Sequence, residues 1–295
     1  MIRTNRHPHS KRETNRTRGA SFFTVLGATV LLSGCFGPAA LETAYNNADW
    51  LIGKEVERRF CPAAPRRAAF ESAIDGFLRW HRKSELPKYA ATLRQLARSL
   101  EGGLTRAEFD EVAVEVEDAG RRLWKRLTGP SVSLLARAET HELECMERSA
   151  AEGLEKAKKD AAKTTAALDQ VKSLVGRLEG FTGAFSDAQT SSLVTAWGMT
   201  RESLEAELAQ RGRSTTAFLA IFEQSEPRAR QRALEAVFEG RRRLTGDDAE
   251  STRRKGLERI WTVVDLLTES QRATLKKTAD TLAEKLEEMA TRRRG

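Results

Sequence analysis

Three cysteines and four histidines are the residues of this chain best suited to metal or covalent chemistry. His141 and Cys145 lie four positions apart, so on a helix both could face one zinc ion. The zinc-protease pattern, however, needs a second histidine, and the sequence offers no third ligand either. His81 is predicted to be a packed or surface histidine. We therefore expect no metal, no cofactor and, without a recognisable nucleophile or nucleotide motif, no enzyme activity.

The N-terminal residues have the features of an export signal. Residues 1–34 hold six basic residues and one acidic residue, and an uncharged apolar run occupies 21–32. That run is short for a membrane-spanning helix, which needs ~20 residues, and the layout is that of a secretory signal peptide. It ends in Leu32-Ser33-Gly34-Cys35, which resembles the bacterial lipobox. The resemblance implies that Cys35 carries lipid and is the mature N-terminus. A plain signal peptide or an uncleaved anchor is the alternative.

Lipidation of Cys35 would leave two thiols in an oxidising compartment. Cys61 and Cys145 are then expected to form a disulfide, which would join the turn at Pro62 to Pro65 to a distant helix. The alternative is two separately buried thiols.

The charge of the chain depends strongly on its leader. The whole sequence has a net charge of +8, but beyond residue 34 there remain 44 basic and 41 acidic residues. A nucleic-acid-binding domain needs a basic face on its folded part, so we exclude that class. No small-molecule substrate is evident from the sequence.

Helical periodicity predicts an all-α fold, a helical bundle or stacked helical hairpins. Apolar residues recur in steps of three and four, as in Phe109, Val112, Val116, Ala119, Leu123 and Leu127. We expect a signal peptide at 1–34, a lipidated N-terminus and tether at 35–40, one helical unit at 41–150, an exposed connecting helix at 151–164 and a second unit at 165–295. Helix breaks are predicted at residues 62–65, 102–103, 129–130, 180–183, 212 and 246, and Pro87 should start or kink a helix.

Three helices are predicted to open with a capping box, in which the side chains of the first and fourth residues bond each other's backbone N–H. The pairs are Thr105 with Glu108, Ser186 with Gln189 and Thr268 with Gln271, each after a Leu or Phe. The motifs start at 104, 185 and 267, so their spacings of 81 and 82 residues allow an internal duplication. Ordinary capping is the simpler explanation.

Two family resemblances follow from these motifs. Leu267-Thr268-Glu269-Ser270-Gln271 resembles the Leu-Thr-x-x-Gln motif of periplasmic stress proteins of the Spy and CpxP type, and the Spy type acts as an ATP-independent chaperone. The segments 45–51, 77–82 and 85–89 resemble a family of proteobacterial lipoproteins of unknown function. The second resemblance implies location and fold but no activity.

We therefore expect an outer-membrane lipoprotein that faces the periplasm and binds the bilayer through Cys35. Its expected role is non-catalytic binding, chaperone-like toward unfolded or envelope proteins. The alternative is a structural adaptor that docks an envelope complex or the cell wall. The five tryptophans, spread along the chain, could be core anchors or could line a client groove.

Overall fold

The computed structural model describes residues 38–163, 165–198, 200–240, 244 and 249–292, and all regular secondary structure within them is helical. This confirms the all-α prediction. Leu32, Ser33, Gly34 and Cys35 lie outside the described residues. No helix in the described part is long and apolar enough to cross a bilayer. The elements are α2 (Pro38–Asn46), α3 (Ala48–Phe60), α4 (Ala64–Ser84), α5 (Leu86–Glu101), α6 (Arg106–Leu135), α7 (Thr140–Ala161), α8 (Ala166–Thr182), α9 (Asp187–Trp197), α10 (Arg201–Leu219), the 3-10 helix η1 (Ala220–Glu223), α11 (Pro227–Phe238), α12 (Ala249–Leu266) and α13 (Glu269–Thr291).

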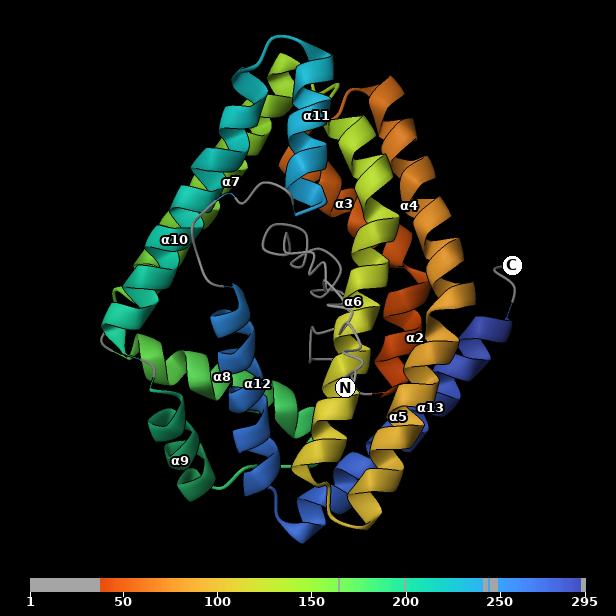
Figure 1. Ribbon diagram of the computed structural model, residues 1–295, viewed down its shortest axis with the longest axis vertical. Helices are drawn as coiled ribbons and strands as arrows, with labels where there is room; N and C mark the ends of the chain where they lie inside the picture. Colours follow the sequence, from red (N-terminus) through yellow and green to blue (C-terminus); the bar gives the residue numbers. More distant parts are fainter. Residues whose placement is uncertain (1–37, 164, 199, 241–243, 245–248, 293–295) are drawn as a thin grey trace, which may run out of the picture.

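The helices are arranged as a closed frame (Figure 1). One side is the α7–α10 pair, and the opposite side contains α3, α4 and α6. At one end α11 packs on α6, and at the other end α8, α9 and α12 pack together. The frame is completed by α13, which packs along α5 and also contacts α2, α4 and α8. Contacts therefore connect the predicted units 41–150 and 165–295 directly.

The frame has several cores instead of one. The largest buried cluster joins α3, α6, α7, α10 and α11 around Phe218, Ile221 and Leu234. A second joins α2, α5 and α13, and a third joins α8, α9 and α12. Each amphipathic helix thus buries its apolar stripe against its neighbours in the frame.

Helix boundaries repeat with the spacing of the three capping motifs. α5, α8 and α12 each end just before a motif, and α6, α9 and α13 begin inside one. The preceding helices α4, α7 and α11 complete three successive groups. In the second group the long third helix is divided into α9 and α10 at Gly198, which has a left-handed φ of 52°. The helix pattern supports the duplication hypothesis, extended to three units.

Two of the predicted helix breaks are wrong. α6 continues through Gly129 and Pro130 to Leu135, because Val132 and Leu135 are buried in the largest core while both break residues face solvent. Solvent there can satisfy the backbone carbonyl that the missing N–H of proline leaves free. α10 continues through Gly212, which packs against Leu154 of α7. The predicted break at Gly246 lies outside the described residues.

Other predicted breaks are present. Residues 61–63 separate α3 from α4, and the loops at 102–105 and 183–186 precede two of the capping boxes. Pro87 lies in the first turn of α5, where its missing N–H removes no helical hydrogen bond. Residues 151–161 form the largely exposed C-terminal half of α7.

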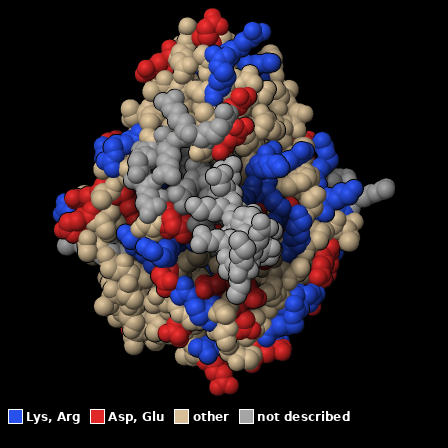
Figure 2. Space-filling view, viewed as in Figure 1, with Lys and Arg blue, Asp and Glu red and all other residues tan. Residues whose placement is uncertain are grey.

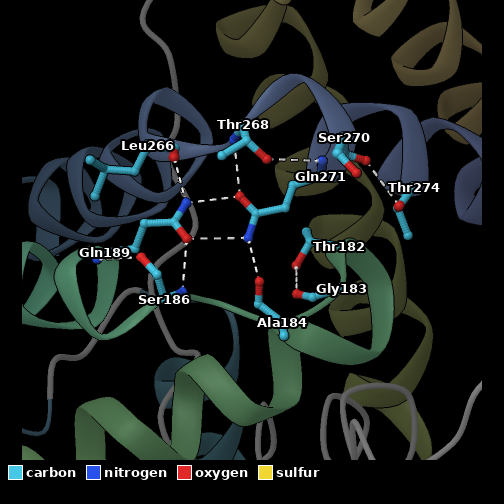
Figure 3. A pocket seen from close by; sticks show the side chains of 10 residues that line it. All are labelled: Thr182, Gly183, Ala184, Ser186, Gln189, Leu266, Thr268, Ser270, Gln271 and Thr274. Atoms are coloured by element: carbon cyan, nitrogen blue, oxygen red, sulfur yellow. Dashed lines mark hydrogen bonds between the residues drawn. The ribbon is translucent and has the colours of Figure 1, made fainter.

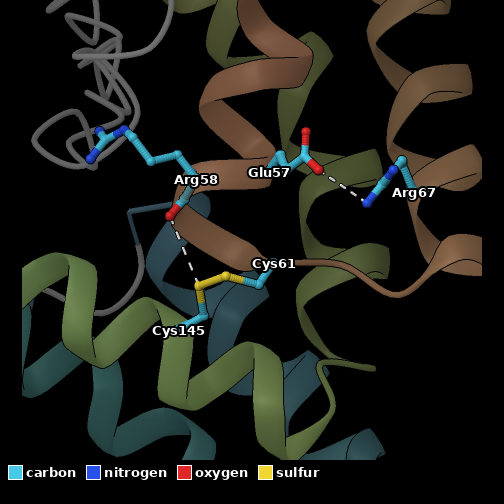
Figure 4. The surroundings of a disulfide bond; sticks show 5 residues. All are labelled: Glu57, Arg58, Cys61, Arg67 and Cys145. Atoms are coloured by element: carbon cyan, nitrogen blue, oxygen red, sulfur yellow. Dashed lines mark hydrogen bonds and ion pairs between the residues drawn. A yellow bond between two sulfur atoms is a disulfide. The ribbon is translucent and has the colours of Figure 1, made fainter.

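The predicted disulfide joins Cys61, at the end of α3, to Cys145 on α7 (Figure 4). The Cα atoms are 6.1 Å apart, and Cys145 is buried. Beside it, an ion pair of 3.1 Å between Glu57 and Arg67 spans the turn between α3 and α4. The bond therefore ties two sides of the frame together near one end.

Removing this bond should destabilise the frame. The disulfide closes a chain segment with a separation of 84 residues, and the chain-entropy model assigns such a loop about 4 kcal/mol. Reduction, or the double change Cys61→Ala and Cys145→Ala, should lower the urea midpoint accordingly, as followed by circular dichroism. The double variant should not respond to reductant. Equal midpoints for the oxidised and reduced wild type would contradict this role.

Candidate functional site

A buried polar cluster lies where α4 passes into α5. It consists of Tyr45, His81, Glu85, Tyr89 and Arg122, from α2, α4, the α4–α5 junction, α5 and α6. The junction is a single residue, Glu85, because Pro87 starts α5 directly after α4 ends. The three segments that resemble a lipoprotein family therefore meet at one place in the fold.

Glu85 is a fully buried carboxylate with two cationic partners. Arg122 Nε donates to one carboxylate oxygen at 2.8 Å, and Lys88 Nζ donates to the other at 2.9 Å. A buried charge is tolerated only when it is paired and hydrogen-bonded. The pair with Arg122 thus fixes α6 against the α4–α5 junction.

His81 is 3 % exposed and packs among aromatic rings. Its Nδ1 is 2.9 Å from the Tyr45 hydroxyl, and the rings of Phe77, Trp80 and Tyr89 surround it. Burial lowers the pKa of His81 to about 4, against the opposing charge of Glu85. The histidine is neutral at physiological pH, as expected for the packed residue that the sequence predicts.

The neighbouring Tyr89 also stays neutral. Burial, reinforced by the charge of Glu85, raises the pKa of its phenol, and its hydroxyl is buried without a hydrogen-bond partner among the described residues. A neutral phenol and a neutral imidazole in a packed cluster serve cohesion between helices.

The same region fixes α2 to α13. Arg82 donates to the Met289 backbone oxygen at 3.1 Å and to Asn46 Oδ1 at 3.0 Å, and its guanidinium lies 5.0 Å from the Tyr45 ring centroid. Arg292 pairs with Glu42. α2 is therefore held by both α4 and α13.

A second polar feature joins two of the capping boxes (Figure 3). Gln189 Nε2 donates to Gln271 Oε1 at 2.8 Å and to the Leu266 backbone oxygen at 2.7 Å. In return, Gln271 Nε2 donates to the Ala184 oxygen at 2.7 Å. Each glutamine oxygen still accepts the N–H of its own cap residue, Ser186 or Thr268. We call this arrangement the glutamine pair.

The glutamine pair is locally two-fold symmetric. Each amide bonds the carbonyl two residues before the other's cap residue, so the two corners make equivalent contacts. They line an open hollow of about 480 Å³. The third box is also formed, because Thr105 and Glu108 bond each other's backbone N–H. A glutamate has no N–H donor, so the Thr105 corner cannot form such a pair.

The zinc arrangement considered for His141 and Cys145 is not found among the described residues. No group of His, Cys, Asp and Glu in the described ranges could hold a metal ion. Cys145 is consumed by its disulfide, and the exposed His141 lies 3.6 Å from Glu139. The capping boxes and the disulfide could be predicted from the sequence, whereas the glutamine pair and the contacts of Glu85 could not.

A comparison with protein-family models finds a match over more than half of the chain. A family model described as a family of unknown function, DUF6279, matches residues 63–249. No curated protein and no solved structure matches the chain. The match covers the α4–α6 side of the Glu85 contacts and the Ser186 corner of the glutamine pair.

Disrupting the glutamine pair should cost more than losing one capping bond. Gln271→Ala would remove the capping bond to Thr268 together with the bonds to Ala184 and Gln189, and we expect about 2 kcal/mol of destabilisation in urea unfolding. Glu108→Ala, at the unpaired corner, is the matched control and should cost about 1 kcal/mol. Gln189→Ala and Gln271→Ala together should cost less than their sum by about 1 kcal/mol. Strict additivity would show that the amides are not coupled.

The buried His81 should make stability depend on pH. Its pKa is about 4 in the folded state against 6.5 for an ordinary histidine, so the unfolded chain takes up the proton first as pH falls. Its contribution is complete above pH 6.5 and is lost toward pH 4, by about 3 kcal/mol. His81→Gln should remove this slope between pH 6.5 and 4.5, as measured by urea unfolding. His141→Gln is the exposed control; an unchanged slope in His81→Gln would refute the assignment.

Proposed function

The chain belongs to this family of unknown function, and we propose that it is a lipid-anchored protein of the bacterial cell envelope with a non-catalytic binding role. The sequence supports the anchor, through the basic leader, the apolar run and the lipobox-like Leu32-Ser33-Gly34-Cys35. With Phe36 after the cysteine, we propose the outer membrane and a body that faces the periplasm.

The attachment of α2 to the body is the observation that carries this proposal. α2 begins at Pro38, three residues after Cys35, and consecutive Cα atoms are about 3.8 Å apart. Its contacts with Arg82, His81 and α13 fix α2 to the frame. A lipid on Cys35 would therefore hold the whole frame close to the bilayer, as suits a docking protein.

The surface favours an adaptor as the form of binding. Exposed large apolar side chains are dispersed over four helices, and the hollow at the glutamine pair is lined by hydroxyl and amide groups. A surface whose exposed apolar residues are dispersed in this way suits docking to a specific envelope component. The chaperone-like role is supported by Val114 and Val116 on α6 and Ile260 on the adjoining α12, which are at least half exposed.

Lipidation is tested on protein purified from membranes. Mass spectrometry of the mature N-terminus should find an acylated Cys35, since several acyl chains make a durable anchor. Cys35→Ser should abolish the acyl mass. It should also abolish the retention of the protein in membranes that depends on the acyl chains. Loss of Cys61 and Cys145 should leave the acyl mass unchanged. A mature N-terminus elsewhere in the chain would refute the anchor.

The same purified protein separates the two forms of binding. Cross-linking in the intact envelope should give a discrete partner for an adaptor. Suppression of light scattering from an aggregating model protein at near-stoichiometric ratios, without ATP, would instead establish chaperone-like binding. If the experiments gave no discrete cross-link and no suppression, the binding role would be contradicted.

A further inference from the structure

A basic strip crosses the exposed face of α4 next to α2. It consists of Arg79, Arg82 and Lys83 on α4 and Lys125 and Arg126 on the adjoining α6. Figure 2 shows Lys and Arg side chains gathered over α6 and α4. The Arg126 guanidinium lies 5.8 Å from the Trp80 ring centroid, which joins the two parts of the strip.

Helix geometry makes the strip continuous with α2. Successive residues of an α-helix are about 100° apart, so Arg82, Arg79, Lys83 and Trp80 follow one another around α4. Arg82, at one border, bonds Asn46 of α2, and Trp80, at the other border, meets Arg126 of α6. The strip therefore extends from α2 to α6 without interruption.

Three charges of the strip, those of Lys83, Lys125 and Arg126, remain available to a ligand. Glu85, the carboxylate at the end of α4, is buried and bonded to Lys88 and Arg122. No ion pair within the described residues involves Lys83, Lys125 or Arg126, and all three side chains are exposed. A surface of this kind complements an anionic one.

An exposed aromatic residue lies on α3, which packs against α4. Trp50 is 62 % exposed and Leu51 is 37 % exposed, and Trp50 comes one helical turn after Asn46. Tryptophan is favoured at membrane interfaces, where its apolar ring and its N–H are both satisfied. Cationic side chains beside such an anchor are attracted to anionic lipid head groups.

We propose that the basic strip and Trp50 form the membrane-facing surface of the protein, which binds the phosphate head groups of anionic phospholipids. The inference rests on the proposed lipid anchor for its geometry. The distance from Cys35 to Asn46 is at most about 25 Å, which is the sum of three Cα–Cα steps and the length of α2. The anchor brings the strip to the bilayer, and the strip then sets the orientation of the frame.

The test uses the mature protein reconstituted in vesicles that contain brominated phospholipids, with and without phosphatidylglycerol. Quenching of Trp50 fluorescence, isolated by difference from Trp50→Phe, should be about twofold or more stronger in the anionic vesicles. Lys83→Glu with Lys125→Glu and Arg126→Glu should abolish that difference. Reversal of Lys156, Lys158 and Lys159 on α7 is the matched control and should preserve it.

Each outcome decides between the alternatives. Equal Trp50 quenching in neutral and anionic vesicles, or quenching unaffected by strip reversal, would overturn the lipid assignment. If strip reversal instead removed a protein cross-link in the envelope, the strip would be a protein interface, which also overturns it. The mass of the mature N-terminus reports separately on the anchor, so failure of the proposed function is distinguishable from failure of this surface.

Discussion

A carboxylate with no access to water has to be matched by cations, and Glu85 imposes that requirement where four helices meet. Its two oxygens are occupied by Arg122 and Lys88, so α4, α5 and α6 can pack only in a register that brings these groups together. Leaving a buried charge unpaired typically costs several kcal/mol. His81 and Tyr45, packed in the same cluster, then determine where α2 lies, and α13 packs over the α2–α5 core.

The sequence predicted local features well, because they depend on neighbouring residues. A capping box needs only a hydroxyl and a Glu or Gln three positions later, so Thr105, Ser186 and Thr268 could be identified as helix starts. The disulfide could be predicted because only two thiols remained to be paired. Pro87 was informative because its ring restricts the backbone locally.

Features that depend on tertiary neighbours could not be predicted in this way. Pro130 fails to end α6 because burial of Val132 and Leu135 outweighs the local penalty. The glutamine pair joins residues 82 positions apart, and no periodicity shows that two amides will face each other. The sequence shows that Glu108 differs from Gln189 and Gln271. The consequence of that difference becomes clear only in the fold, where the two glutamines face each other. Likewise, Glu85 looked like one of many acidic residues until its burial was known.

The closure of the frame by α2 and α13 has a consequence for the order of folding. Among the described helices α13 comes last along the chain, yet it provides much of the surface on which α2 packs. The core shared by α2, α5 and α13 can therefore close only after α13 has been made. Until then α2 lacks the packing surface of α13, so it becomes fixed in the frame late in synthesis.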